Sequence, residues 1–359
     1  MKKCSNCLIP DSVPGVHLGE NGLCRACVDY LKNPAVHTAL SEEQREKRER
    51  DLEQALVDCR GRGQYDCIVP FSGGKDSVYL LYRLRAVYKL KVLAFTSNIN
   101  LPDIAWANIR RTLEHLDVDH ITVSISRTFI RKLFRYLLMH QEARGAVYSV
   151  SYVYAPIFEG QAIKLALEKD VPLVLAGYSP GQPEPERMLY EFSQTLVRKV
   201  DWTPPHLLGN PEFTEEELAC FYNPLNYPVG TEFPRYLAPY HAWKYDQAEI
   251  MREVVNLDLV ANSKHASPIF SNYPINWLMM YSDLRSFGYN PYAPEFAALI
   301  REGKASRVYW RFGFPFIDWI TRHKVLVGGQ VKVMMKWLDL KDEDLKITLP
   351  KGAYDPVLP

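Results

Sequence analysis

The chain has 359 residues, of which 47% are hydrophobic and 24% are charged, and its formal net charge is +1. This composition is typical of a globular protein, and the length predicts two domains or one large domain with attachments. The balanced charge argues against a nucleic-acid partner, although a local basic patch can hide in such a total. No apolar run approaches the length of a bilayer span and the N-terminus lacks a signal-peptide pattern, so we expect a cytoplasmic protein without a membrane partner.

Residues 1–36 are expected to form a small metal-binding unit. Two residues separate Cys4 from Cys7, and two separate Cys24 from Cys27. Such paired knuckles bring four thiolates to the corners of a tetrahedron, which is typical of structural zinc. A unit of this size cannot build a sufficient apolar core, so the metal would supply its folding energy. An iron–sulfur cluster is the alternative. Four closed thiolate ligands would leave no open position on zinc, so we expect no catalysis at that ion.

Residues 37–64 form the expected helical linker. Ser41 and Gln44 have the spacing of a capping box, and Leu52, Ala55 and Leu56 supply an apolar stripe. The remaining cysteines do not form another Cys-x-x-Cys pair. Cys67 is expected to be a small buried residue, whereas Cys220 follows an acidic run that can place it at the surface. A persulfide on either thiol is the alternative interpretation.

Residues 65–230 alternate between strand-like and helix-like patterns. The expected strands are 66–71, 91–97, 120–126 and 172–177, and the expected helices are 78–90, 103–116, 128–140 and 157–169. This alternation predicts an α/β fold with a doubly wound, mostly parallel sheet. Prolines and aromatic residues are dense over 202–243, where we expect a surface wrap or lid. Residues 231–359 are expected to form a mainly helical extension that binds an acceptor substrate or a partner.

The segment from Ser72 to Ser77 reads Ser-Gly-Gly-Lys-Asp-Ser and joins the first strand to the first helix. Glycines there let the backbone approach a ligand, and the N–H groups of a helix start attract anions. The hydroxyls of Ser72 and Ser77 and the charge of Lys75 add to this cradle. The segment therefore predicts a site for a phosphate-bearing ligand; the alternative is a glycine-rich turn that caps an ordinary helix.

The same string resembles the pyrophosphate loop of the N-type ATP pyrophosphatases, which have an adenine nucleotide alpha hydrolase-like fold. The resemblance implies that ATP is cleaved between its α and β phosphates, with Lys75 and Asp76 catalytic and with Ser72, Gly73, Gly74, Lys75, Asp76 and Ser77 around the nucleotide. Mg²⁺ would help neutralise the departing pyrophosphate. Asp76 either holds that metal or fixes the loop through backbone N–H groups.

The resemblance also implies roles for the ends of two later strands. Ser97 and Asn98 would meet the adenine and ribose, and the alternative is an Asx-type turn. Gly177 would close over ATP, with Tyr178 and Gln182 near the acceptor; a plain β-turn is the alternative there. Glu184 and Glu186 can bind magnesium or remain solvated. His241 and Lys244 can complete the acceptor pocket, although the plainer interpretation of this cluster is a helix N-cap by Asp246.

The order of cysteine unit, loop segment and aromatic C-terminal extension is similar to the N-acetyl sugar amidotransferase branch of these enzymes. Members convert an acetamido group of a nucleotide-linked sugar to an acetamidino group, so the amide oxygen would be adenylated and ammonia would displace AMP. A separate glutamine amidotransferase subunit would supply the ammonia. One stretch, Ser151–Pro156, departs from the branch and implies a changed acceptor. Thiolation of a nucleobase, tRNA or small molecule, and a non-catalytic nucleotide- or nucleic-acid-binding module, are the alternatives.

Overall fold

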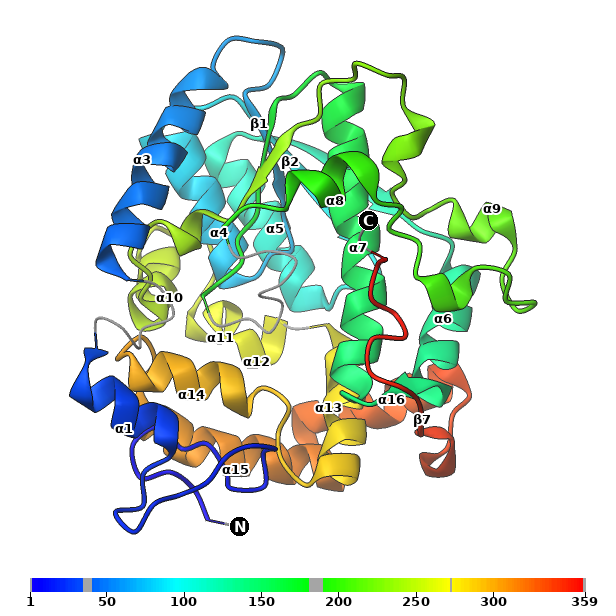
Figure 1. Cartoon of the computed structure of the whole chain (residues 1–359). Coiled ribbons are helices and arrows are strands. Elements are labelled where there is room, and N and C mark those ends of the chain that lie inside the picture. The colour runs from blue at the N-terminus through cyan, green and yellow to red at the C-terminus, as the bar shows by residue number, and fades with distance from the viewer. Residues whose placement is uncertain (1, 35–40, 181–189, 272, 358–359) are drawn as a thin grey trace.

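A parallel β-sheet lies at the centre of the molecule. The computed structural model describes residues 2–34, 41–180, 190–271 and 273–357. The five-stranded sheet has the order β3-β2-β1-β5-β6, and each neighbouring pair is parallel (Figure 1). The strands are β1 (Cys67–Pro70), β2 (Val92–Asn98), β3 (Asp119–Ser124), β5 (Leu173–Leu175) and β6 (Arg235–Leu237). The predicted α/β fold is therefore confirmed.

The sheet extends further along the chain than the sequence suggested. β6 lies beyond residue 230, which is the predicted end of the sheet-bearing domain. It falls inside the segment 202–243 that was expected to wrap the surface. Arg235 anchors this strand through ion pairs to Asp51 at 2.8 Å and Glu191 at 2.7 Å. A second small sheet pairs β4 (Gln141–Glu142) with β7 (Ile347–Leu349) and was not predicted.

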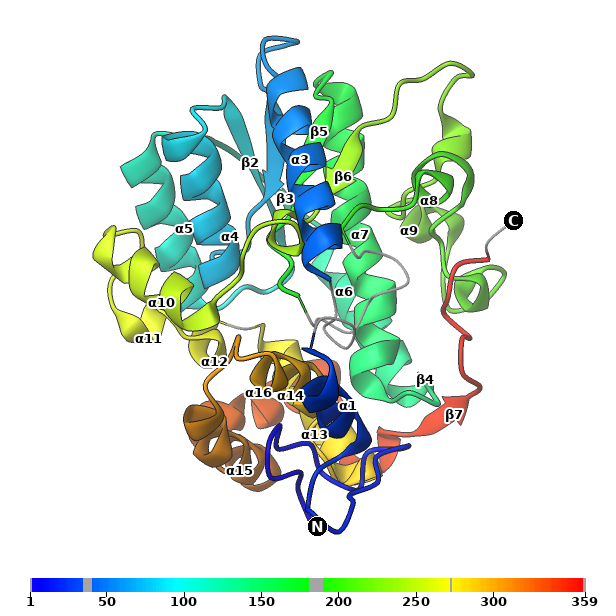
Figure 2. The same ribbon diagram turned by 60° about the vertical axis from the view of Figure 1, so that its left-hand side comes forward.

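Each face of the central sheet is covered by helices, as a doubly wound fold requires (Figure 2). Cys67, Val69 and Leu173 point into a core shared with α3, α4, α5 and α10. Their neighbours Ile68 and Val174 point into the opposite core, which includes α7 and α8. The alternation follows from the pleat of a strand, whose successive side chains face opposite sides. The helices named here are α3 (Glu42–Asp58), α4 (Lys75–Tyr82), α5 (Asp103–Leu116), α7 (Ala146–Glu168), α8 (Gln194–Lys199) and α10 (Gln247–Asn256).

The linker helix and the first α/β helices agree with their sequence signals. α3 begins with the predicted capping box, in which Gln44 N–H donates to Ser41 Oγ and Ser41 N–H donates to Gln44 Oε1. Leu52, Ala55 and Leu56 are buried against the sheet core. A π-helical turn over Arg83–Val87 continues α4, and α5 has the predicted bounds.

Helix α7 connects the sheet to the helical C-terminal region. Its first half packs in a core with the C-terminal helices, and its second half, from Ala162 to Ala166, packs against the sheet. The sequence pattern predicts this helix over 157–169 only. The missed half is almost entirely buried and has no charged residue, so it shows no amphipathic stripe. Its N-terminal N–H groups are satisfied by the buried carboxylate of Asp283, which accepts from Ala146 N–H and from Val147 N–H at 3.0 Å.

Below the sheet, the C-terminal helices form a layer that also contacts the N-terminal cysteine unit (Figures 1 and 2). None of the helices in the described ranges combines the length and apolar composition needed to cross a membrane. The remaining helices are α1 (Arg25–Lys32), α6 (Arg127–Met139), α9 (Glu215–Leu218), α11 (Ser263–Ala266), α12 (Pro268–Ser271), α13 (Pro274–Phe287), α14 (Ala293–Arg301), α15 (Arg307–His323) and α16 (Gln330–Leu338).

We predict that Asp283→Ala lowers the free energy of unfolding by about 3 kcal/mol, because two buried N–H groups of α7 lose their acceptor. Chemical denaturation followed by circular dichroism measures this loss. Asp246→Ala is the matched control, since Asp246 caps α10 at a solvent-exposed position, and its loss should be about 1 kcal/mol. Equal losses in the two variants would contradict the structural role given to Asp283.

Candidate active site

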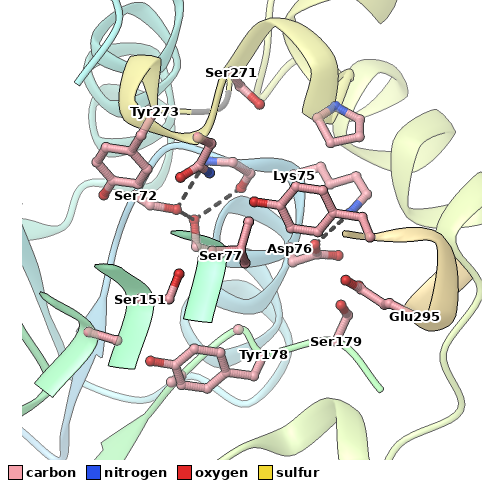
Figure 3. A pocket seen from close by; sticks show the side chains of 18 of the residues that line it. Ser72, Lys75, Asp76, Ser77, Ser151, Tyr178, Ser179, Ser271, Tyr273 and Glu295 are labelled. Carbon is pink, nitrogen blue, oxygen red and sulfur yellow. Dashed lines mark hydrogen bonds and ion pairs between the residues drawn. The ribbon is translucent and has the colours of Figure 1, made fainter. Parts of the chain in front are cut away.

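The loop from Ser72 to Ser77 lies at the carboxyl edge of the sheet, between β1 and α4. Gly74 is the N-cap of α4, so the first turn of this helix opens onto the loop. The two serines close the loop on itself (Figure 3): their hydroxyls lie 3.2 Å apart, and Ser77 Oγ also donates to Gly74 O at 3.0 Å. The predicted strand–loop–helix junction is thus present, and the N–H groups at such a helix start attract anions.

Two glycines allow the loop to approach its neighbours closely. Gly73 has a positive φ of +73°, and a Cβ atom there would lie 2.4 Å from Ala105 O on α5. Fully buried Asn108, from the same helix, donates to Gly73 O at 2.8 Å and holds the loop down. A Cβ atom on Gly177, after β5, would lie 3.0 Å from Ser77 N. The contact and the positive φ restrict position 73 to glycine, whereas a side chain at position 177 would require the loop to shift slightly.

Lys75 and Asp76 form a bonded pair at the start of α4. Lys75 is buried and donates to Asp76 Oδ2 at 2.5 Å. Two tyrosines, which sequence reasoning did not identify, support the pair. Tyr245 OH donates to Asp76 Oδ1 at 3.1 Å, and Tyr240 OH donates to the Asp76 carbonyl at 2.7 Å. The Asp76 carboxylate is thus held by the side chains of Lys75 and Tyr245.

A cavity of about 470 Å³ begins at this loop and continues between α7 and the C-terminal helices. Most of the predicted site residues line it, namely Ser72, Gly74, Lys75, Asp76, Ser77, Ser97, Gly177, Tyr178 and His241. Many of these residues follow parallel strands, and the carboxyl ends of parallel strands meet at one edge of the sheet, which explains why they come together.

Other predicted residues lie elsewhere. Gly73 sits beneath the loop, and Asn98 donates to Ser124 Oγ at 3.3 Å rather than lining the cavity. Lys244 is exposed and also lies outside the lining. Asp246 caps α10 by accepting from Glu249 N–H at 3.0 Å, as the plainer interpretation held. Gln182, Glu184 and Glu186 lie outside the described residues.

Two acidic residues reach the cavity from elements whose patterns gave no functional signal. Glu159 on α7 is buried and accepts from Tyr178 OH at 2.6 Å. Glu295 on α14 faces the bonded pair of Lys75 and Asp76 (Figure 3). Burial raises the pKa of Glu295 to about 8; the charge of Lys75 opposes this shift and that of Asp76 adds to it. In the sequence, a glutamate in the first turn of a helix indicates only a favourable interaction with the positive end of the helix dipole, so the pattern gives no sign of a functional role.

His241 completes the wall of the cavity near Ser179. Burial is the main cause that lowers its pKa to about 4, and the positive charges of Arg48 and Lys304 act in the same direction. The imidazole is therefore neutral at pH 7 and does not add positive charge to the site.

The four predicted metal ligands come together in the N-terminal unit. The Sγ atoms of Cys4, Cys7, Cys24 and Cys27 all lie within 4.8 Å of one another, and those of Cys7 and Cys24 are 3.7 Å apart. A tetrahedral ion with ligands at about 2.3 Å needs sulfur atoms about 3.8 Å apart. The four thiols thus fit a single ion, whereas a cluster of several irons would need to hold them further apart.

The metal unit is attached to the wall of the cavity. Ala297 on α14 packs against the four cysteines, and Arg307 Nη2 donates to the carbonyl of Ser5. Phe296, beside Ala297, lines the cavity, as does Glu295. The cysteine unit therefore supports the helix that carries these two residues.

The other three cysteines are poorly suited to carry sulfur. Burial raises the pKa of Cys59 to about 11, that of Cys220 to about 12 and that of Cys67 well above its usual value. A thiol must ionise to act as a nucleophile, and these shifts oppose ionisation. All seven cysteines lie in the described ranges, and none lines the cavity.

Comparison with protein families finds none that matches the chain. An uncharacterized protein of Methanocaldococcus jannaschii is 31% identical over 120 residues, which is 33% of this chain. The chain spans 40% of the length of that relative, so the match identifies a related segment and leaves the family open.

Three solved structures align with much of the chain. An NMN synthetase from Francisella tularensis aligns with a TM-score of 0.35 and 12% identity, over 85% of this chain and 97% of that one. A U34-tRNA thiolase from Methanococcus maripaludis with its 4Fe–4S cluster aligns with a TM-score of 0.34 and 13% identity, over 88% of this chain and 85% of that one. An NH3-dependent NAD synthetase from Campylobacter jejuni aligns with a TM-score of 0.33 and 15% identity, over 73% of this chain and 98% of that one. At these scores we base the functional argument on the site alone.

Proposed function

We propose that the protein cleaves ATP between the α and β phosphates to adenylate a carbonyl oxygen, and that ammonia then displaces AMP. The observation that carries this proposal is the loop from Ser72 to Ser77. Its N–H groups and buried Lys75 face a cavity that also has room for an acceptor. The part of the cavity beyond the phosphates would hold both the nucleoside and the acceptor.

The proposed reaction balances as a nitrogen-for-oxygen exchange on an amide. The amide oxygen attacks the α phosphorus, the bond to the bridging oxygen breaks, and pyrophosphate leaves. Ammonia then adds to the activated carbon, the carbon–oxygen bond breaks, and AMP leaves with the amide oxygen. The product is an amidinium ion, and one proton of the ammonia is released.

Side chains in the cavity suit these steps. Lys75 and the loop N–H groups would stabilise the negative charge that develops on departing pyrophosphate. Glu295 faces the same space and would accept the proton that ammonia releases. Mg²⁺ would neutralise the phosphates when bound, and the carboxylate of Asp76 is the hard oxygen donor at the loop that can hold it.

We further propose zinc as the ion of the four-cysteine site, with a structural role, because its four thiolates leave no open coordination position. Ammonia is proposed as the nitrogen donor, supplied by a separate glutamine amidotransferase subunit. Ammonium salts should then sustain the reaction when that subunit is absent. Sulfur transfer is the less favoured chemistry, because the three thiols outside the metal site have raised pKa values and lie away from the cavity.

We predict that Lys75→Ala and Asp76→Ala each reduce acceptor-dependent AMP formation by at least about 100-fold. Separation of AMP from ADP after incubation with ATP, Mg²⁺, ammonium and acceptor amides measures this. Metal analysis of both variants should give the wild-type content, because neither residue contacts the cysteine unit. Full activity in either variant, or ADP as the product, would reject the assignment of the site.

We predict that Glu295→Gln slows amidine formation by about 100-fold while leaving acceptor-dependent exchange of pyrophosphate into ATP intact. In the wild type, the rate per concentration of free NH3 should rise with pH and level off above about 8, since only the ionised carboxylate takes up a proton and its pKa is raised to about 8. The variant should lose this rise. An unchanged pH profile in the variant would remove Glu295 from the proposed mechanism.

A further inference from the structure

The far end of the cavity is walled by apolar and aromatic side chains from three C-terminal helices. These residues, which we call the aromatic chamber, are Trp277 and Met280 on α13, Phe296 on α14, and Trp310, Phe314 and Ile317 on α15. All except Phe296 are buried by the fold. The chamber belongs to the same cavity as the loop, so a molecule bound in it can present a group to the α phosphate.

The rings of the chamber contact one another along its wall. The centroids of Phe296 and Trp310 are 4.0 Å apart, those of Trp310 and Phe314 are 4.9 Å apart, and Phe296 meets Phe314 edge to face at 5.7 Å. A well-packed core would fill the space beside such rings with further side chains. An apolar space that is lined in this way favours an apolar ligand over water.

The positive charge in the cavity comes from its loop end. Lys75 is the only Lys or Arg among the described residues that line the cavity, and it already faces Asp76. His241 is neutral at pH 7 because its pKa is lowered to about 4. A phosphate group placed in the chamber would lose its hydration without gaining a cation, and this is strongly unfavourable.

Neutral polar groups are available for an uncharged acceptor. Ser151 on α7 and Ser271 on α12 bring hydroxyls to the cavity (Figure 3). Ser271 Oγ donates to Ser267 O at 3.0 Å, which leaves its oxygen able to accept from an amide N–H. Such groups orient a carbonyl or an amide without requiring a charge on it.

We propose that the aromatic chamber binds the acceptor, and that the acceptor is an uncharged amide with an aromatic or other apolar group rather than a nucleotide-linked sugar. This inference rests on the proposed adenylation reaction and names its substrate class. The apolar group occupies the chamber, and the amide oxygen points to the loop.

Binding without turnover tests the chamber separately from the chemistry. Isothermal titration with the full chain would use phenylacetamide as the uncharged aromatic probe and UDP-N-acetylglucosamine as the charged probe. We expect phenylacetamide to bind more tightly, and Trp310→Ala to weaken it roughly tenfold or more through loss of ring contact. Trp319→Ala is the matched control on the same helix, because Trp319 is 51% exposed; it should leave binding unchanged.

A second variant guards against a folding defect in Trp310→Ala, which removes a large buried side chain. Ile317→Phe introduces a larger side chain that fills part of the space in the chamber. This variant should also weaken phenylacetamide binding roughly tenfold. Circular dichroism would confirm that each variant is folded. Tighter binding of the nucleotide sugar, or phenylacetamide binding that is absent or unaffected by both chamber variants, would overturn the inference. Product analysis that gives ADP instead of AMP would reject the reaction while leaving the binding result intact.

Discussion

The structure depends on the burial of most of α7. One half of this helix covers the sheet and the other half lies among the C-terminal helices, so it holds the two layers in one arrangement. An apolar helix of this kind gains free energy only if both layers assemble around it. Its N-terminus is buried as well, which is why Asp283 must supply acceptors for its first N–H groups. The cavity lies where the two layers meet beside this helix.

This arrangement separates two kinds of chemistry within one cavity. The sheet edge contributes the loop from Ser72 to Ser77, where backbone N–H groups and Lys75 suit phosphates. The C-terminal helices contribute rings and one carboxylate, Glu295, whose pKa is raised by burial. The cysteine unit lies behind α14 and packs against Ala297. A metal bound there would act on the site by keeping Glu295 and Phe296 in place, with no part in the reaction itself.

The sequence predicts local features better than those that depend on long-range contacts. The loop, the capping box at Ser41, the four-cysteine unit and the strands β1, β2, β3 and β5 were expected because each has its own pattern of residues. β6 was missed because it is a short strand in a segment rich in prolines and aromatic residues. The first half of α7 was missed because it is almost entirely buried and has no charged face. Tyr240, Tyr245 and Glu295 reach the site only through tertiary packing, so no local pattern marks them.

The most direct test of the account is the fate of the acceptor's oxygen. An acceptor amide labelled with ¹⁸O at its carbonyl would be incubated with the full chain, ATP, Mg²⁺ and ammonium, and the nucleotide product would be analysed by mass spectrometry. The account predicts that AMP carries the label, because the amide oxygen forms its bond to the α phosphorus before ammonia replaces it. Unlabelled AMP, or ADP in its place, would contradict the claim that this protein activates a carbonyl oxygen by adenylation.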